Sequence, residues 1–258
     1  MEYYLENEHL GMLERNKEFF TQIGLIDKKE NEKNEESVEL EANSYKMYEN
    51  FIKEKDGIIK VIKEMCSYVL NPDKNDNTII TTNKVFIESR NRTIMILFSY
   101  LEQPGLLDPI LPEIIPLMTN TMLTLINQYL KSKVDIQKKI FESILSLSQI
   151  VYNICKIRGF GPISKFFSSE VTVFESVINF LISLPIVHNY HWTVNYVLIL
   201  WSSLLAMVPF DIDTIDSNGF LINNLFSYLK DELLNSSNLR DITAYSLSKF
   251  LTRPDLIK

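Results

Sequence analysis

Apolar residues recur at helical intervals along most of the chain. The clearest run consists of Ile140, Ile144, Leu147, Val151 and Ile154. Steps of three and four residues place these side chains on one face of an α-helix. Lys156 and Arg158 suit the end of this helix, because cations stabilise the negative pole of the helix dipole. Gly159 follows them as a suitable C-cap residue, since glycine adopts left-handed backbone geometry without strain.

Comparable amphipathic runs predict eight further helices, at about 2–22, 45–69, 86–103, 112–131, 164–183, 190–208, 220–234 and 238–251. Asn238 is a suitable N-cap for the last of them. Only residues 78–87 have the β-branched character of a strand, and one strand cannot form a sheet. The predicted fold class is therefore all-α.

The segment 176–210 contains no charged residue and is long enough to cross a bilayer. Pro185, His188, Asn189 and His191 interrupt it in the middle, so neither half reaches the ~20 residues that a spanning helix needs. The second half, 192–208, is apolar nearly all round. This pattern is typical of a helix buried inside a larger helical protein, which we favour over a membrane span.

Five prolines are spaced 44 to 47 residues apart: Pro72, Pro116, Pro162, Pro209 and Pro254. HEAT and armadillo repeats, which consist of two or three packed helices, recur every ~40–47 residues. The spacing and the helical pattern together predict a HEAT/armadillo-type α-solenoid, a stack of helix pairs. Pro116 nevertheless falls inside a predicted helix.

The acidic charge lies mostly at the start of the chain. Residues 1–60 contain 15 acidic and 9 basic side chains, within a total formal charge of −7. Much of the excess falls in 28–44, which has few apolar residues, and we predict a disordered acidic insert there. Its alternative role is an acidic docking segment. The first 20 residues lack the apolar core of a secretory signal, which favours a cytoplasmic protein.

The sequence contains no recognisable catalytic or nucleotide-binding motif. It lacks the phosphate-binding loop, the dinucleotide fingerprint and the nucleophile elbow, and its seven glycines form no glycine-rich loop. The acidic pI near 5.1 argues against a nucleic-acid-binding protein. We therefore predict a protein that is not an enzyme and has no cofactor.

Three small groups of residues are candidate sites. His188 and His191 lack the further ligands that zinc needs, so we expect ordinary loop histidines. Cys66 and Cys155 lie among apolar residues and are expected to be buried, inert thiols. The remaining group is expected to form helix caps and a turn rather than a calcium loop: Asp211, Asp213 and Asp216.

Four segments between residues 100 and 255 resemble the tubulin-folding cofactor D family. The first, Tyr100–Pro109 (YLEQPGLLDP), is similar to the family's Y-x-E-Q-P-x-L-L-D-P, and the second, Lys156–Phe160, to its K-x-R-G-Y. The third, Trp192–Asp211, resembles W-x-x-R-Y, L-L-L-W-L and P-F-D at matching offsets, except that Asn195 occupies the arginine position. The fourth, Arg240–Asp255, resembles R-D-x-x-A-x-x-L-S-x-F-x-T-R-P-D.

The resemblance implies the N-terminal part of a longer solenoid that handles tubulin. Members of the family bind β-tubulin and act with cofactors E and C and an Arf-like small GTPase. Together they assemble or dismantle the αβ-tubulin heterodimer, and the assembled complex promotes GTP hydrolysis by tubulin. The resemblance thus implies a cytoplasmic, microtubule-associated chaperone without nucleic-acid binding or membrane insertion. The alternative is a HEAT/armadillo adaptor with another client.

The resemblance also offers candidate binding residues, each of which has a structural alternative. The candidates are Lys156, Arg158, Trp192, Arg240 and Arg253. Lys156 and Arg158 are candidates for facing an acidic partner. Trp192 is expected to pack between repeats, and Arg253 is expected to hydrogen-bond helix-terminal carbonyls across a repeat junction.

Overall fold

The computed structural model describes residues 36–71, 79–184, 192–209, 211–216, 219–234 and 238–256. The chain divides into two compact units, Met1–Asn43 and Ser44–Lys258. The described part of the first unit, 36–43, is helical. The second unit contains all the features discussed below. The predicted helix at 2–22 lies outside the described residues.

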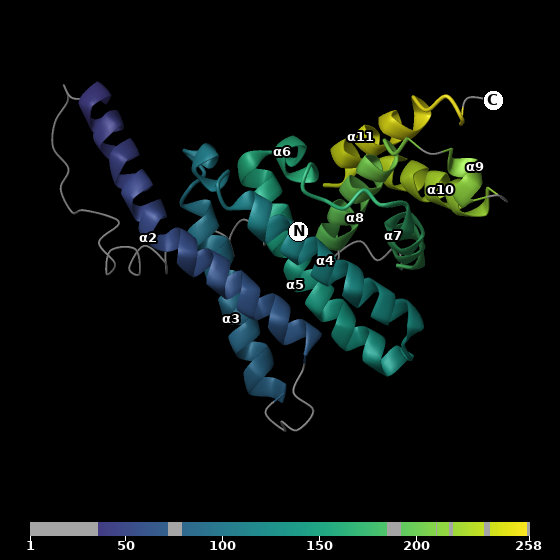
Figure 1. Cartoon of the computed structure of the whole chain (residues 1–258), viewed down its shortest axis with the longest axis horizontal. Coiled ribbons are helices and arrows are strands. Elements are labelled where there is room, and N and C mark those ends of the chain that lie inside the picture. Colours follow the sequence, from purple (N-terminus) through teal and green to yellow (C-terminus); the bar gives the residue numbers. More distant parts are fainter. Residues whose placement is uncertain are drawn as a thin grey trace. The chain divides into compact units, whose positions relative to one another are not determined.

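The described residues form helices and no strand (Figure 1). The elements are α2 (Glu36–Leu70), α3 (Ile79–Phe98), the 3₁₀ turn η1 (Pro104–Leu107), α4 (Leu111–Lys131), α5 (Val134–Arg158), α6 (Phe160–Ser164), α7 (Val171–Ser183), α8 (Trp192–Leu205), α9 (Ile212–Ile215), α10 (Phe220–Leu234) and α11 (Arg240–Leu251). The all-α prediction is confirmed. None of the described helices is long and apolar enough to span a membrane.

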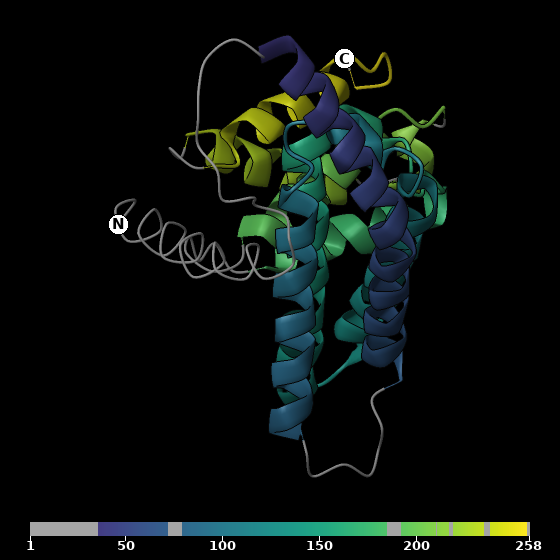
Figure 2. The same cartoon turned by 90° about the vertical axis from the view of Figure 1, so that its left-hand side faces the viewer.

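Six helices pack as three successive pairs: α4 with α5, α7 with α8, and α10 with α11. The pairs stack in register, because α4 packs on α7 and α7 on α10, while α5 packs on α8 and α8 on α11. This produces two layers of helices, which is the arrangement of a solenoid. The helix α3 also packs on α5, beside which it runs in Figure 2. Tyr68 of α2 contacts Phe86 of α3, their ring centroids 5.7 Å apart.

The middle of this stack explains the apolar helices of the sequence. The helix α8 packs against α5, α7 and α11, and most of its side chains are buried, including Asn195, Ile199 and Ser202. Four residues of the apolar run on α5 are likewise fully buried: Ile144, Leu147, Val151 and Ile154. Helices between two neighbouring repeats therefore bury more than one face, as the sequence pattern predicted.

The disordered insert predicted at 28–44 stays a prediction, because 28–35 lie outside the described residues and 36–44 form the start of α2. Two local predictions were wrong. Residues 79–87 are helical, not extended, because β-branched residues disfavour a helix only slightly and tertiary packing of Phe86 outweighs that preference. Asn238 does not cap α11, whose N-cap residue is Leu239 without a side-chain hydrogen bond.

The prolines do not mark repeat boundaries uniformly. Pro209 and Pro254 follow α8 and α11, but Pro116 lies inside α4 and Pro162 inside the short helix α6. Pro72 lies outside the described residues. Pro116 is the sixth residue of α4, beyond the first turn, where a proline removes a hydrogen bond within the helix. The repeat comes from helix stacking, and proline spacing indicates it only indirectly.

Candidate functional site

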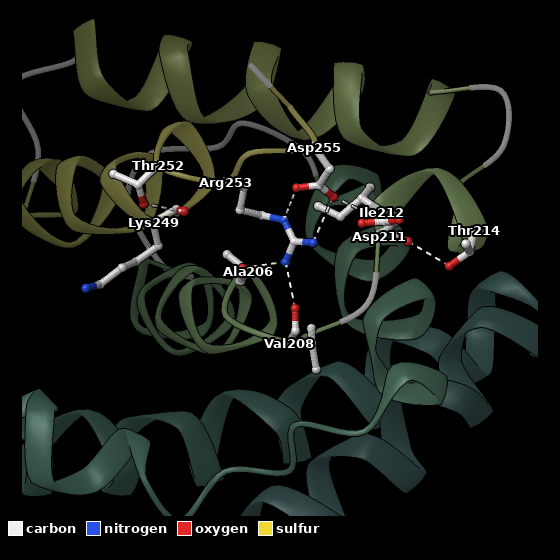
Figure 3. Close-up of polar contacts among 9 residues, drawn as sticks. All are labelled: Ala206, Val208, Asp211, Ile212, Thr214, Lys249, Thr252, Arg253 and Asp255. Carbon is white, nitrogen blue, oxygen red and sulfur yellow. Dashed lines mark hydrogen bonds and ion pairs between the residues drawn. The ribbon is translucent and has the colours of Figure 1, made fainter. Parts of the chain in front are cut away.

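The guanidinium of Arg253 forms several hydrogen bonds at once with neighbouring segments (Figure 3). Arg253 follows α11, and its side chain is only 10% exposed. Its Nη1 donates to the backbone oxygens of Ala206, at 2.7 Å, and Val208, at 2.9 Å. Both carbonyls lie just past the C-terminal end of α8. Arg253 therefore satisfies carbonyls that the end of that helix leaves without partners, as predicted.

Asp255 holds the same guanidinium from its other edge. Nε and Nη2 of Arg253 donate to the two carboxylate oxygens of Asp255 at 2.9 and 2.8 Å. One of those oxygens also accepts the backbone N–H of Ile212, at 2.8 Å, at the start of α9. The Arg253 hydrogen bonds in particular lower the pKa of the Asp255 carboxyl to about 2. These two side chains thus connect the segment after α11 to both sides of the loop between α8 and α9.

Arg158 and Asp108 form a second ion pair, which also contains two hydrogen bonds. Nε and Nη2 of Arg158, the last residue of α5, donate to the two carboxylate oxygens of Asp108 at 2.6 and 2.9 Å. Asp108 directly follows η1. The side chains are 30% and 47% exposed, so water competes with this pair more than with the Arg253 pair. The hydrogen bonds from Arg158 lower the pKa of the Asp108 carboxyl.

Lys156 and Trp192 contact aromatic rings of neighbouring helices. The Lys156 ammonium lies 5.7 Å from the centroid of the Phe98 ring, and the lysine side chain remains exposed. Trp192 is half-buried and packs edge-on against Tyr152 of α5, their ring centroids 4.6 Å apart. Trp192 thus packs between neighbouring helix pairs, as predicted. Arg240 begins α11 with an exposed side chain and is not part of these contacts.

Gly159 ends α5 with φ +89°, a conformation that L side chains rarely adopt, and its N–H bonds to the Cys155 oxygen at 2.8 Å. The predicted C-cap is therefore confirmed. Cys155 and Cys66 are both buried free thiols, and burial raises the pKa of each. A thiol held protonated is a poor nucleophile, which agrees with the prediction of inert cysteines.

Among the described residues, no three or more His, Cys, Asp or Glu side chains gather as a metal site would require. His188 and His191 lie outside them. Asp216 accepts the backbone N–H of Ile222 in the first turn of α10, at 2.9 Å, and so acts as the predicted cap. Asp211 occupies the N-cap position of α9 without a side-chain cap bond, and the Asp213 side chain is not described.

Comparison with known proteins identifies the family of this chain. The family model "Tubulin-specific chaperone D-like, ARM repeat" matches residues 97–258, well over half of the chain. The chain belongs to the tubulin-specific chaperone D-like family. The matched region contains the three stacked helix pairs, so the all-α fold is an armadillo/HEAT-type solenoid.

A relative with a similar sequence is tubulin-folding cofactor D of Schizosaccharomyces pombe. The two are 24% identical over 153 residues, which is 59% of this chain and 12% of that relative. The chain therefore spans about an eighth of the length of this curated relative. No solved structure matches the sequence.

The four family-like segments meet in pairs in this tubulin-specific chaperone D-like chain. The Asp108–Arg158 ion pair joins the first segment to the second. Arg253 and Asp255 of the fourth contact Ala206, Val208 and Ile212 around the end of the third. The four segments are spaced here as in the family, and contacts between neighbouring repeats are a physical reason to keep that spacing.

Sequence reasoning missed the two carboxylates as partners. Asp108 and Asp255 both lie inside the quoted segments, but neither was among the candidate residues. The sequence contained a signal for these pairs, because the quoted segments contain both acidic residues and arginines. It does not say which acidic residue contacts which arginine. Likewise, Ser202 and Ser246 share a buried hydrogen bond of 3.1 Å between α8 and α11, and nothing in their spacing indicates it.

Asn195 lies in a buried polar cluster with Tyr228 and Glu232 of α10. Burial, followed by the nearby Glu232 charge, raises the pKa of the Tyr228 hydroxyl. Asn195 carries no charge where the resemblance implied an arginine. The side chain of residue 195 that lies beside Tyr228 is therefore a neutral amide rather than a cation.

Proposed function

We propose that this chain is a β-tubulin-binding, non-catalytic part of a cofactor D-like chaperone that takes part in assembling and dismantling the αβ-tubulin heterodimer. The supporting observation is the family match across residues 97–258. The name of the fission-yeast relative supplies the connection to tubulin folding. Stacked helix pairs also offer the extended surface that a large protein client requires.

The proposal includes the partners of that reaction. Cofactors E and C and an Arf-like GTPase act with the chain in the cytoplasm and at microtubules. The chain stimulates GTP hydrolysis by tubulin only within that complex, since no catalytic motif occurs in its sequence. Its own contribution is binding and positioning, without a cofactor.

Among the candidate binding residues, Lys156 and Arg240 are the best choices for client contact. Both side chains are exposed, whereas Arg253 is 10% exposed and holds a carboxylate and two carbonyls. Arg158 also uses its guanidinium edge on Asp108. We propose that Arg158, Trp192 and Arg253 keep the repeats together and that Lys156 and Arg240 meet the acidic client.

Binding of β-tubulin to the immobilised full chain tests the main proposal. We expect the chain to retain freshly chaperonin-folded β-tubulin and not a control protein of similar acidity, such as serum albumin. Equal retention of both proteins would argue against a tubulin chaperone and favour an adaptor with another client.

Charge reversal tests the residue assignment separately. Lys156→Glu and Arg240→Glu are expected to weaken β-tubulin binding, because each removes an exposed cation and adds a like charge facing the client. Lys165→Glu is the matched control, since Lys165 is also an exposed lysine. If all three variants retain β-tubulin equally, the client binds through another surface.

A further inference from the structure

The turn between α4 and α5 carries an exposed surface that the proposed tubulin role does not use. Figure 1 shows the two helices running side by side to this shared turn. Three large apolar side chains are exposed there: Leu130 at 40%, Val134 at 79% and Ile136 at 53%. Exposed apolar side chains grouped at one place are a common feature of binding sites.

Four exposed lysines lie close to these apolar side chains in the sequence: Lys131, Lys133, Lys138 and Lys139. The sequence from 131 to 139 contains one acidic residue, Asp135, whose side chain is not described. Within the described residues, none of the four lysines forms an ion pair with a carboxylate. This end of the hairpin is thus locally basic in a protein of net charge −7. We call these seven side chains the hairpin tip.

The backbone holds the hairpin tip in a fixed shape. Only Ser132 and Lys133 separate the two helices. The Ser132 N–H bonds to the Tyr129 oxygen at 3.1 Å, and Nε2 of Gln137 donates to that same oxygen at 3.1 Å. A surface ordered before binding loses less conformational entropy when a partner arrives.

A shallow hollow of about 390 Å³ adjoins the hairpin tip along α4. It is lined by Thr124, Asn127, Gln128, Lys131 and Ser132. The side-chain amides of Asn127 and Gln128 offer both donors and acceptors, which suit a peptide backbone or a carboxylate better than an acyl chain. Asn127 is itself positioned by Ser176 of α7, whose hydroxyl lies 2.8 Å from the Asn127 amide oxygen.

We propose that the hairpin tip and its hollow bind an acidic, extended peptide segment that carries apolar side chains. The lysines complement its carboxylates, the three apolar residues contact its apolar side chains, and the hollow accepts its polar backbone. Repulsion between two sets of tip lysines disfavours a second copy packed tip to tip, and the polar hollow favours a peptide over a membrane.

Fluorescence anisotropy of the full chain tests this proposal without tubulin. The probe is a short fluorescein-labelled peptide of alternating glutamate, phenylalanine and glycine. We expect saturable binding that weakens with salt, and much weaker binding of peptides with glutamine for glutamate or alanine for phenylalanine. Binding that does not distinguish the three peptides would overturn the proposal.

Matched variants locate the binding. The double variant Lys133→Ser/Lys138→Ser is expected to lower the affinity for the acidic peptide about tenfold at low salt. The double variant Val134→Ser/Ile136→Ser is expected to lower it by a similar factor. Lys165→Ser/Lys230→Ser removes two exposed lysines elsewhere and is expected to change the affinity less than about twofold. Equal losses in the tip and control lysine variants would overturn the location. Unchanged thermal melting midpoints are expected, because all six substituted side chains are exposed.

The competing occupants give different results. Phosphatidylserine vesicles are the first alternative. If they bind the chain through the tip lysines and the acidic peptide does not bind, the occupant of the hairpin tip is a membrane and not a peptide. Concentration-dependent dimerisation that is lost in Val134→Ser/Ile136→Ser would identify a second copy instead. Either result, without peptide binding, contradicts the proposal and leaves the tubulin proposal unaffected.

Discussion

Arg253 and Asp255, only two residues apart, form an ion pair with two hydrogen bonds of 2.9 and 2.8 Å beside the loop between α8 and α9. Each also contacts that loop, Arg253 through two carbonyls and Asp255 through one backbone N–H. The pair is a structural connection between the last two helix pairs of the stack. This role accounts for an arginine and an aspartate in the fourth family-like segment without invoking a client.

Arg253→Ala is therefore expected to destabilise the chain. The substitution leaves the Asp255 carboxylate and two carbonyls without their donor, which typically costs about 2–4 kcal/mol. Urea unfolding followed by circular dichroism measures the change. Arg253→Lys is expected to recover only part of it, because an ammonium cannot donate along two edges. A loss below about 0.5 kcal/mol for Arg253→Ala would contradict this role.

Acid stability should report on Asp255. Its pKa is lowered to about 2 in the folded chain from about 3.9 when unfolded. A lowered folded pKa gives stability that is fully present above about pH 4 and is lost as the pH falls toward 2. Asp255→Asn should be less stable at pH 7 and should lose less stability than the parent chain between those pH values. Parallel pH profiles of the two chains would contradict the prediction.

The Asp108–Arg158 pair is expected to contribute less than the Arg253 pair, because both of its side chains are substantially exposed. Arg158→Ala should lower the thermal melting midpoint slightly, and added salt should shrink the difference from the parent chain. Arg253→Ala is the comparison variant. An Arg158→Ala effect as large as that of Arg253→Ala and insensitive to salt would show a stronger role for this junction.

Trp201 anchors the centre of the stack. Its ring is fully buried, lies 5.4 Å from the Phe167 ring, and its Nε1 donates to the Ser168 oxygen at 2.7 Å. Trp201→Ala is expected to cost about 3–5 kcal/mol, and Trp201→Phe less, because the phenyl ring fills part of the space but loses the hydrogen bond. Trp192→Phe, at a half-buried position, is the control. Urea unfolding of all three variants tests this order.

Both cysteines should react slowly with thiol reagents in the folded chain. Burial raises the pKa of Cys66 and Cys155, so little thiolate is present at neutral pH. Ellman's reagent is expected to modify both thiols rapidly in urea and neither rapidly in buffer. Fast modification in buffer would show that the helices around them open readily.

The sequence by itself determined most of the described helices, the stacking class and the family. Helical periodicity predicted α5, α8 and α10 closely, because an amphipathic or fully apolar helix carries its burial pattern in its own residues. The same local reading failed at 79–87, where β-branched residues resembled a strand although packing favours a helix. Local preference is weak beside tertiary burial, so such errors occur where the two disagree.

Only the tertiary structure decided which polar side chains meet. Arg158 finds Asp108 fifty residues earlier, and Arg253 reaches the Ala206 carbonyl 47 residues earlier. These separations along the sequence equal about one helical repeat. Each partner is therefore brought close by the stacking of repeats and not by its place in the local sequence. The hairpin tip is different, because its lysines and apolar residues lie within residues 130–139 and a local two-residue turn between α4 and α5 brings them together. There the structure added that these side chains are exposed.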